Sequence, residues 1–257
     1  CFTADAIDRT PPVTVLKVAP ALPDTPDGWY TRPPALSLSA NERRATVYYR
    51  WDEGSDTEYT APLSAPEGEH LFRFHSRDPA GNTEAERAFA VRVDTTPPVT
   101  NLTVAPPDGR AGWYMSAPNV RLGSEDGAFI FYRWEGQNET NYTSPFLPPE
   151  GFSGLVYHSV DRHGNIESNQ SIEFRVDTMR PVSAIHTDPS APDGENGLFL
   201  WTPVIRLETE PRGEIFYRWD GGAETRYLLT LLAAEGRHNL TYYAMDPAGN
   251  REEPQTF

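Results

Sequence analysis

The chain has 257 residues, a formal net charge of −15 and a high content of proline (25) and glycine (19). This acidity argues against a nucleic-acid partner and against binding to an anionic membrane surface, because both need clustered basic side chains. Aromatic residues make up 12% of the sequence and supply core material, so the composition indicates a folded, turn-rich β-protein.

The sequence predicts neither an internal disulfide nor insertion into a membrane. Cys1 is the single cysteine, and no stretch of about 18 apolar residues occurs. No charged and then apolar leader opens the sequence, so an intact signal peptide is not expected. Cys1 is interpreted as a point where a longer chain was cut, and a lipid-modified start after signal removal is the alternative.

Residues 2–8 have the pattern that recurs at 89–94 and 172–177. We interpret them as the last strand of a module whose body is absent from the sequence. Thr10-Pro11-Pro12 follows, where consecutive prolines fix φ and hold the preceding residue extended. A short, semi-rigid joint is therefore predicted here and at Thr96-Pro97-Pro98.

The segments after the first joint alternate apolar and polar residues, which is typical of short strands with one buried face. The first two are residues 13–18 and 35–39, with Gly28-Trp29-Tyr30 between them. In the third, Val47, Tyr49 and Trp51 share one face, which we assign to the core. Tyr48 and Arg50 lie on the opposite face.

Markers with a common period predict three tandem copies of one module. The segment 48–52 returns at 131–135 and 216–220, and its tryptophans are 83 and 85 residues apart. A second marker keeps the same step: Asp78–Asn82, Asp161–Asn165 and Asp246–Asn250. The predicted segments are 1–8, the terminal strand of a preceding module, then repeats 9–93, 94–176 and 177–257, of which the third has a truncated last strand.

The penultimate strand of each repeat is predicted to point every second side chain inward. The three inward sets are Phe72, Phe74 and Ser76; Leu155, Tyr157 and Ser159; Leu240, Tyr242 and Ala244. The small third residue is expected to make room for the indole of the central strand. Asn239 is expected to point outward.

Six or seven short strands per repeat, separated by turn signals and without a helical period, indicate a two-sheet sandwich. The cysteine and tryptophan pattern of antibody domains is absent from the sequence. The predicted fold is all-β, with three tandem Ig-like β-sandwich modules that form an extended rod.

Four stretches carry a resemblance to a known class: residues 49–52, 67–70, 76–84 and 93–99. They resemble Ig-like extracellular repeats of bacterial and archaeal surface proteins, including OmpL-type β-domain repeats. The resemblance covers all three repeats and is weakest in the third, where Pro-Pro becomes Arg180-Pro181. It implies spacing, display or adhesion in a large envelope or secreted protein, and it implies no catalysis.

The recurring Asp-x-x-Gly-Asn loops allow two interpretations. Aspartate and asparagine oxygens suit calcium, but the same residues form a hairpin turn without any metal. Asp8, Asp94 and Asp177 at the joints would add ligands. The candidate calcium residues are Asp78, Asn82, Asp161, Asn165, Asp246 and Asn250.

No catalytic group stands out in the sequence. The six histidines lack metal-ligand spacing and are predicted to lie on the surface; His70 and His75 should point to opposite faces of one strand. No nucleophile with a base, zinc-protease motif or phosphate loop occurs. The chain is therefore predicted not to be an enzyme and to need no cofactor, with calcium as the open case.

Five N-x-[ST] sequons favour an extracellular location at a cell surface. The predicted glycosylation sites are Asn101, Asn138, Asn141, Asn169 and Asn239. Polar β-proteins are rich in Asn and Thr, so the composition by itself is the alternative explanation.

The function that the sequence favours is a structural spacer or adhesion segment of a large surface protein, as a stalk or as part of a surface layer or filament. Its partners would be neighbouring modules or other copies of a surface protein. The alternative is a carbohydrate-binding accessory region of a secreted enzyme, with glycans stacked on exposed Trp29, Tyr30, Trp113 and Tyr114. In a third interpretation, residues 1–8 complete the last strand of a neighbouring molecule.

Overall fold

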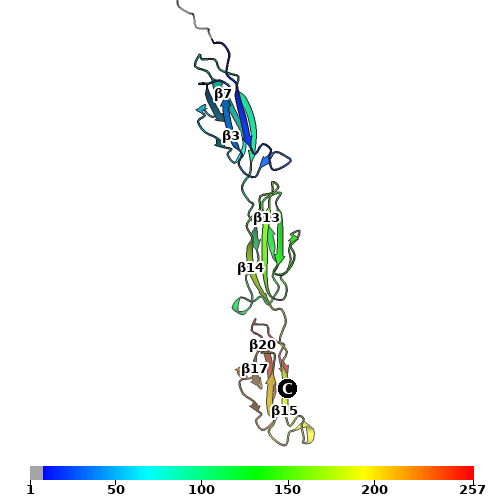
Figure 1. Cartoon of the computed structure of the whole chain (residues 1–257). Coiled ribbons are helices and arrows are strands. Elements are labelled where there is room, and N and C mark those ends of the chain that lie inside the picture. Colours follow the sequence, from blue (N-terminus) through cyan, green and yellow to red (C-terminus); the bar gives the residue numbers. More distant parts are fainter. Residues whose placement is uncertain (1–7) are drawn as a thin grey trace, which may run out of the picture. The chain divides into compact units, whose positions relative to one another are not determined.

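The computed structural model describes residues 8–257 and is almost entirely β (Figure 1). Two 3-10 turns, η1 (Arg110–Gly112) and η2 (Glu195–Gly197), are the only helical elements in this range. Over the same residues, no helix has the length and apolar character needed to cross a membrane. The all-β prediction is confirmed, whereas residues 1–7, with Cys1 and most of the predicted terminal strand, lie outside the described residues.

The chain divides into two compact units. The N-terminal unit holds the described residues up to Thr100 together with Ser124–Ile130 and His158–Ser168. The C-terminal unit holds Asn101–Gly123, Phe131–Tyr157 and Asn169–Phe257. The three repeat boundaries and the extended rod therefore stay predictions.

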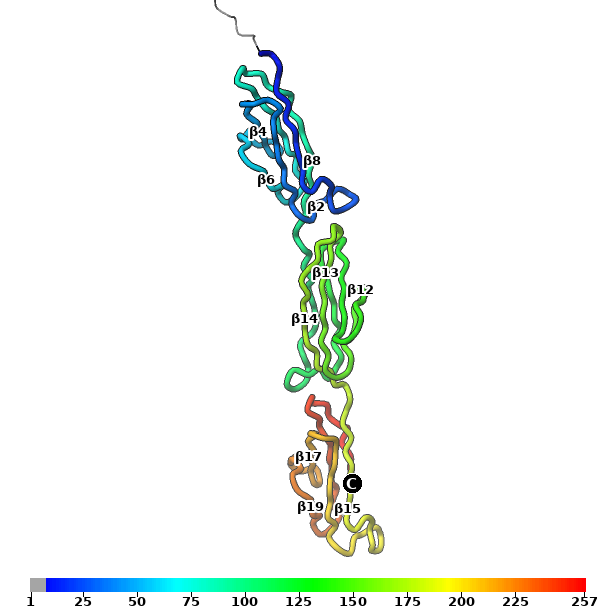
Figure 2. Tube along the Cα trace, in the orientation of Figure 1, coloured from blue at the N-terminus to red at the C-terminus, as the bar shows by residue number. Residues whose placement is uncertain are grey.

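Two sheets of the N-terminal unit enclose a common core. One has the strand order β1-β3-β6 and the other β2-β8-β7-β4-β5, in which β2 runs parallel to β8. Figure 2 traces the backbone of this unit. Side chains of both sheets, including Leu36, Phe72 and Phe74, meet between them. The strands are β1 (Thr14–Ala19), β2 (Trp29–Tyr30), β3 (Ala35–Ala40), β4 (Thr46–Trp51), β5 (Thr57–Glu58), β6 (Leu63–Ser64), β7 (Gly68–Arg77) and β8 (Arg87–Val93).

The next strands form a two-stranded sheet, β10-β9, and a four-stranded sheet, β12-β11-β13-β14. Leu122, Leu155 and Phe174 are among their buried side chains. The ring of Tyr132 stacks on Phe146 with centroids 4.4 Å apart. The strands are β9 (Asn101–Thr103), β10 (Arg121–Gly123), β11 (Phe129–Trp134), β12 (Thr140–Asn141), β13 (Gly151–Val160) and β14 (Gln170–Val176).

The last strands repeat this arrangement inside the C-terminal unit, with sheets β15-β16-β19 and β18-β17-β20-β21. Ile205 and Leu207 of one sheet pack against Ile215, Leu240 and Tyr242 of the other. The strands are β15 (Ala184–Asp188), β16 (Val204–Glu208), β17 (Glu214–Trp219), β18 (Thr225–Arg226), β19 (Leu231–Leu232), β20 (Leu240–Met245) and β21 (Gln255–Thr256). The β-sandwich prediction is confirmed by these facing sheets.

The predicted inward side chains of β7, β13 and β20 are all buried, so the period-two assignment is confirmed. The reason given for the small third residue is wrong. Trp51 of β4 lies opposite Phe72, whereas Ser76 lies opposite Val47 and far along the strand from the indole. The space beside Ser76 is occupied instead by the carboxylate of Glu84.

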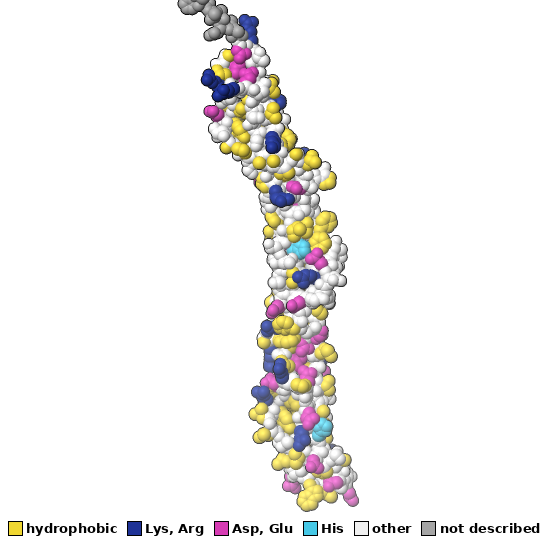
Figure 3. All heavy atoms as spheres, in the orientation of Figure 1, with side chains coloured by type: hydrophobic (Ala, Val, Ile, Leu, Met, Phe, Trp, Pro, Cys, Tyr) yellow, Lys and Arg dark blue, Asp and Glu magenta, His cyan; other side chains and the backbone are white. Residues whose placement is uncertain are grey.

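The surface charge is mixed. Acidic and basic side chains are interspersed over the face that Figure 3 shows. Although the whole chain has a net charge of −15, the acidic side chains on that face do not form a single patch.

Candidate functional site

The loop Asp161–Asn165 is a turn closed by the carboxylate of its first residue. Asp161 Oδ1 accepts the backbone N–H groups of His163, Gly164 and Asn165 at 2.8, 2.7 and 2.9 Å. Burial opposes ionisation of this carboxyl, but the hydrogen bonds outweigh it and lower the pKa of Asp161. Gly164 has φ +95°, a conformation that glycine adopts without steric cost.

The asparagine that ends this loop also binds a segment far away in the sequence. Asn165 Nδ2 donates to Asp161 Oδ2 at 2.8 Å and to the carbonyl oxygen of Asp94 at 2.9 Å. Asp94 stands directly before the joint that contains Pro97 and Pro98. We call this hydrogen bond from the loop asparagine to the backbone carbonyl before the joint the joint tie. It recurs twice, from Asn82 Nδ2 to Asp8 O at 3.2 Å and from Asn250 Nδ2 to Asp177 O at 2.7 Å.

His163 adds contacts that the other two loops lack, because Ala80 and Ala248 occupy its position. Its Nδ1 bonds to the carboxylate of Asp94, and its ring stacks on Trp29 with centroids 4.4 Å apart. Its side chain is 3% exposed, and Nε2 has no hydrogen-bond partner. The prediction that all histidines lie on the surface is therefore wrong for His163, whose partners are distant in sequence.

The loops Asp161–Asn165 and Asp246–Asn250 each meet a turn of nine residues, which we call the receiving turn, and a third segment has the same form. Each turn starts at an aspartate whose carboxylate accepts the backbone N–H seven residues later. The three turns are 24–32, 108–116 and 193–201, closed by Thr31 N to Asp24 at 2.8 Å, Met115 N to Asp108 at 2.7 Å and Leu200 N to Asp193 at 2.7 Å. Trp29, the partner of His163, belongs to the first turn.

In the C-terminal unit, the second receiving turn contacts the loop Asp246–Asn250. Arg110 N donates to Ala248 O at 2.8 Å. A Cβ on Gly109 would lie 2.6 Å from that carbonyl oxygen, so only glycine fits there. A Cβ on Gly249 would lie 3.3 Å from Met115 Sδ, which shows how close the two segments pack.

A glutamate two residues after each loop accepts hydrogen bonds from the start of the first strand segment of its sandwich. We call this contact the glutamate clasp. Glu84 accepts the backbone N–H of Thr14 at 3.0 Å, the Thr14 hydroxyl, and the Ser76 hydroxyl at 2.7 Å. Burial opposes its ionisation, but these hydrogen bonds outweigh it and lower the pKa of Glu84.

The same clasp recurs in the other two repeats. Glu167 accepts the Thr100 N–H at 2.9 Å, and Glu252 accepts the Ser183 N–H at 2.9 Å. Sequence reasoning missed these glutamates as a set. The signal was their fixed place two residues after each loop asparagine.

The predicted calcium residues all lie in the three turns, where hydrogen bonds account for them without a metal. Asp161 Oδ1 already accepts three N–H groups, and Asn165 directs its amide donor toward the carboxylate. Calcium would need six to eight oxygens at roughly 2.4 Å. The donor set of this loop does not fit that shell, and calcium binding stays a prediction.

The first loop has more carboxylate oxygen nearby. Oxygens of Asp8, Glu42 and Asp78 lie within 4.8 Å of one another. Burial, and then the charges of Asp8 and Asp78, raise the pKa of Glu42. Asp78 is nevertheless hydrogen-bonded by Asn82 through both of its oxygens.

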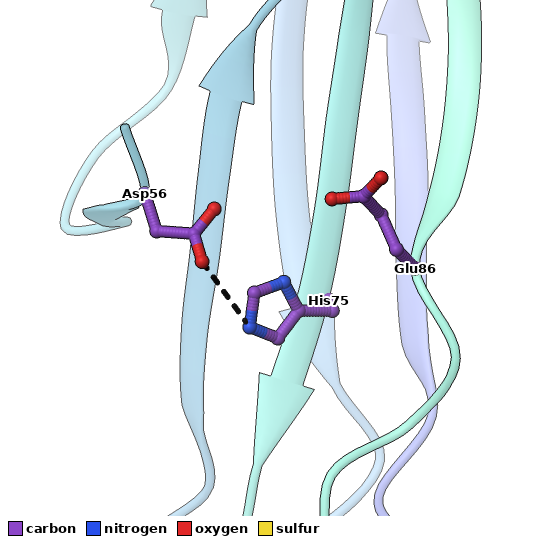
Figure 4. Close-up of side chains that lie close together, drawn as sticks. All are labelled: Asp56, His75 and Glu86. Carbon is purple, nitrogen blue, oxygen red and sulfur yellow. Dashed lines mark ion pairs between the residues drawn. The ribbon is translucent and has the colours of Figure 1, made fainter. Parts of the chain in front are cut away.

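A second cluster, Asp56, His75 and Glu86, lies on the outer face of the five-stranded sheet (Figure 4). His75 lies between the two carboxylates, and its Nε2 is 3.9 Å from Asp56 Oδ2. Glu86 is bound by Arg50 at 2.9 Å and Arg73 at 3.2 Å, and these pairs lower its pKa. Two guanidinium groups beside one carboxylate oppose a cation, so the cluster is an ion-pair network.

The aromatic residues predicted to bind sugars are largely covered. Tyr30 and Tyr114 are buried, and the Tyr114 hydroxyl donates to Ala105 O at 2.8 Å. The prediction that these two tyrosines are exposed is wrong, because each pairs in parallel with the end of a long strand. Trp29 and Trp113 are partly buried, and a face of Trp29 is occupied by His163.

The asparagines of all five sequons are exposed, as N-linked modification requires. Asn239 follows the prediction that it points outward. Glycosylation at Asn101, Asn138, Asn141, Asn169 and Asn239 stays a prediction.

No protein-family model matches the chain, and no curated protein matches it. Among solved structures, it is similar to a 1.5-MDa bacterial ice-binding adhesin at 12% identity, over 97% of each chain, with a TM-score of 0.35. It is also similar to the fibronectin(III)-like modules of Clostridium thermocellum CbhA, at 13% identity, over 63% of this chain and 94% of that one, with a TM-score of 0.29. The similarity concerns the fold alone.

Proposed function

We propose that the chain is a non-enzymatic structural segment of an extracellular surface protein, in which tandem β-sandwich modules act as a spacer. The observation that supports this proposal is the joint tie, made three times by Asn82, Asn165 and Asn250. Each tie joins a loop to the residue before a proline-containing joint, and so restricts that joint. The most regularly repeated polar residues thus hold chain segments together.

Small-angle X-ray scattering tests the spacer function. We expect the intact chain to give an extended particle with a uniform cross-section. A triple variant, Asn82→Ala, Asn165→Ala and Asn250→Ala, should keep the cross-section and lose the well-defined maximum dimension, because its joints move more freely. The variant Asn138→Ala, at an exposed position, is the matched control. A compact particle, or a triple variant identical to the native chain, would contradict the proposal.

Carbohydrate binding is a second candidate, and one observation favours it. A hollow of about 820 Å³ in the C-terminal unit is lined by Trp201, Trp219 and Phe257, and Trp201 is 75% exposed. An exposed indole at a hollow can stack on a sugar face. Binding on a glycan array that disappears in Trp201→Ala would support this function, and silence of the folded chain would remove it.

A further inference from the structure

The joint that follows Asp94 is also held by a glutamate from the turn before β7. The carboxylate of Glu67 accepts the backbone N–H and the hydroxyl of Thr95, both at 2.9 Å, and the hydroxyl of Thr96 at 3.2 Å. We call this contact the threonine clamp. Because the joint tie of Asn165 binds the carbonyl of Asp94, the joint is held at two successive residues by two different segments.

The joint that follows Asp177 has the same clamp. The carboxylate of Glu150, from the turn before β13, accepts the backbone N–H of Thr178 at 2.7 Å and its hydroxyl at 3.2 Å. Asn250 supplies the joint tie there. The clamp is therefore a second repeated device that restricts a joint.

A histidine holds the turn that carries the first of these clamps. His70 Nε2 lies 2.8 Å from the carbonyl oxygen of Glu67, and Nδ1 lies 2.8 Å from Asp52 Oδ2. Both of these partners are acceptors, so the ring satisfies both only when it is protonated and donates from both nitrogens. In the turn before β13, Ser153 stands where His70 stands, so this clamp has no imidazole behind it.

The groups around the ring decide which bond is lost when it becomes neutral. The N–H of Leu71, and then the ring itself, lower the pKa of Asp52, and the charge of Arg73 contributes less. An ionised carboxylate is the stronger acceptor, so it keeps the remaining ring proton at Nδ1. Trp51 meets the ring edge-on, with centroids 6.0 Å apart, and the β8 residue paired with His70 is the uncharged Val91. Loss of the proton therefore leaves the Nε2 lone pair facing the carbonyl oxygen of Glu67.

We infer that His70 makes the joint after Asp94 responsive to pH: the protonated ring holds the turn of Glu67 and keeps its threonine clamp closed, and the neutral ring releases it. The inference rests on the proposed function and names a regulation of its joints. The joint after Asp177 is the internal comparison, because the clamp of Glu150 has no such ring.

The pH range follows from the partners of the ring. The bond to Asp52, and then the bond to the Glu67 carbonyl, raise the pKa of His70. The clamp is therefore closed below the ordinary histidine pKa of about 6.5 and opens as the pH rises through the higher folded value. Between about pH 5.5 and about pH 8.5, carboxyl groups of ordinary pKa are ionised, and histidines are the side chains whose charge changes.

Amide exchange with water, measured by nuclear magnetic resonance on the full chain, tests the inference. Each rate is divided by the rate of an unstructured chain at the same pH, which removes the intrinsic effect of pH. This relative rate should rise by about five-fold or more for Thr95 between about pH 5.5 and about pH 8.5, because the amide loses a hydrogen bond. The relative rate of Thr178 should stay the same.

Two variants separate the ring from the clamp. His70→Gln has no group that titrates, so the relative rate of Thr95 should be equal at both ends of the range. Glu67→Ala, at an exposed position, removes the clamp and should give fast exchange of Thr95 throughout, while the ring of His70 still titrates. His186→Gln, also at an exposed position, is the matched control and should behave like the native chain.

His163 is the other titratable ring at this joint, because its Nδ1 bonds to the carboxylate of Asp94. It is retained in His70→Gln. A pH response of Thr95 that persists in that variant would assign the switch to His163 and overturn the inference. Equal relative rates for native Thr95 at both ends of the range, or the same response at Thr178, would overturn it as well.

The spacer function is tested separately. The scattering comparison of the native chain with the triple asparagine variant is made at one pH and does not depend on His70. The spacer function therefore stands when the joint ignores pH, and a pH-responsive Thr95 would not rescue it from a compact particle.

Discussion

The side-chain amide of Asn165 donates a hydrogen bond of 2.9 Å to the backbone carbonyl of Asp94, which lies 71 residues earlier in the chain. The same amide holds the carboxylate of Asp161 at 2.8 Å, so one side chain fixes both its own turn and the segment that precedes Pro97 and Pro98. Because Asn82 and Asn250 make the same pair of bonds, the tie is a property of the repeat.

Removing this tie should loosen the turn locally. We expect Asn165→Ala to lower the local opening free energy around residues 158–168 by about 1–3 kcal/mol, because a partly buried carbonyl and a buried carboxylate lose their donor. Hydrogen exchange with mass spectrometry measures this as faster exchange in peptides that contain 161–167. Asn138→Ala, at an exposed position, should leave exchange there unchanged, and equal protection in Asn165→Ala would contradict the assigned role.

Removing the glutamate clasp should reduce the stability of the first strand, β1, by a comparable amount. Glu84→Gln replaces a carboxylate that accepts the Thr14 N–H and the Ser76 hydroxyl, and should reduce stability by about 1–3 kcal/mol. Hydrogen exchange of β1 is the measurement, with the exposed Glu235→Gln as control.

The clasp should also depend on pH. Because folding lowers the pKa of Glu84, its contribution is present above its ordinary pKa of about 4.3 and is lost as the pH falls through the lowered folded value. The difference between the native chain and Glu84→Gln should therefore shrink in acid. A difference that grows in acid would assign the stabilisation to another group.

The buried face of each strand could be predicted because it is a local property. Successive side chains of a strand alternate between faces, so Phe72, Phe74 and Ser76 follow from the pattern of one segment. The joint tie and the glutamate clasp could not be derived in the same way, because their partners are about 70 residues apart. Only the assembled sandwich brings these groups together.

The pairing of strands explains two of the wrong expectations. Trp29 and Tyr30 form a strand of two residues, too short to carry a period, and their burial depends on pairing with β8. The register of β4 against β7 places Trp51 opposite Phe72. Ser76 lies away from Trp51, and its hydroxyl donates to the carboxylate of Glu84. β4 and β7 are not consecutive strands, so neither a connecting turn nor the alternation within one strand reveals their register.

His163 should strengthen the joint that follows Asp94. His163→Ala gives this loop the alanine that the other two loops have, and it removes both the pairing with Asp94 and the stack on Trp29. We expect faster hydrogen exchange in the peptide that contains Asp94 and a change in the fluorescence of Trp29. His186→Ala, at an exposed position, is the matched control, and an unchanged joint in His163→Ala would show that the tie of Asn165 is sufficient.

Because of two other histidines, we expect the stability of the chain to depend on pH near neutrality. His70 Nδ1 lies 2.8 Å from Asp52 Oδ2, and Nε2 lies 2.8 Å from the carbonyl oxygen of Glu67. Both ring nitrogens can donate only when the ring is protonated. The bond to Asp52, and then the bond to the Glu67 carbonyl, raise the pKa of His70. Asp220 and the carbonyl of Glu235 act in the same way on His238.

The sign of the effect follows from the raised pKa values. The stabilisation is fully present below the unfolded pKa of about 6.5 and is lost as the pH rises through the higher folded value. The double variant His70→Gln and His238→Gln should therefore have a lower thermal midpoint than the native chain at about pH 5.5, and the two midpoints should converge toward about pH 8.5. Differential scanning calorimetry across this range measures the difference, with His186→Gln as the control at an exposed site. A difference that persists at the alkaline end would mean that the neutral rings stabilise the chain by packing against Trp51 and Trp219, and that protonation contributes nothing.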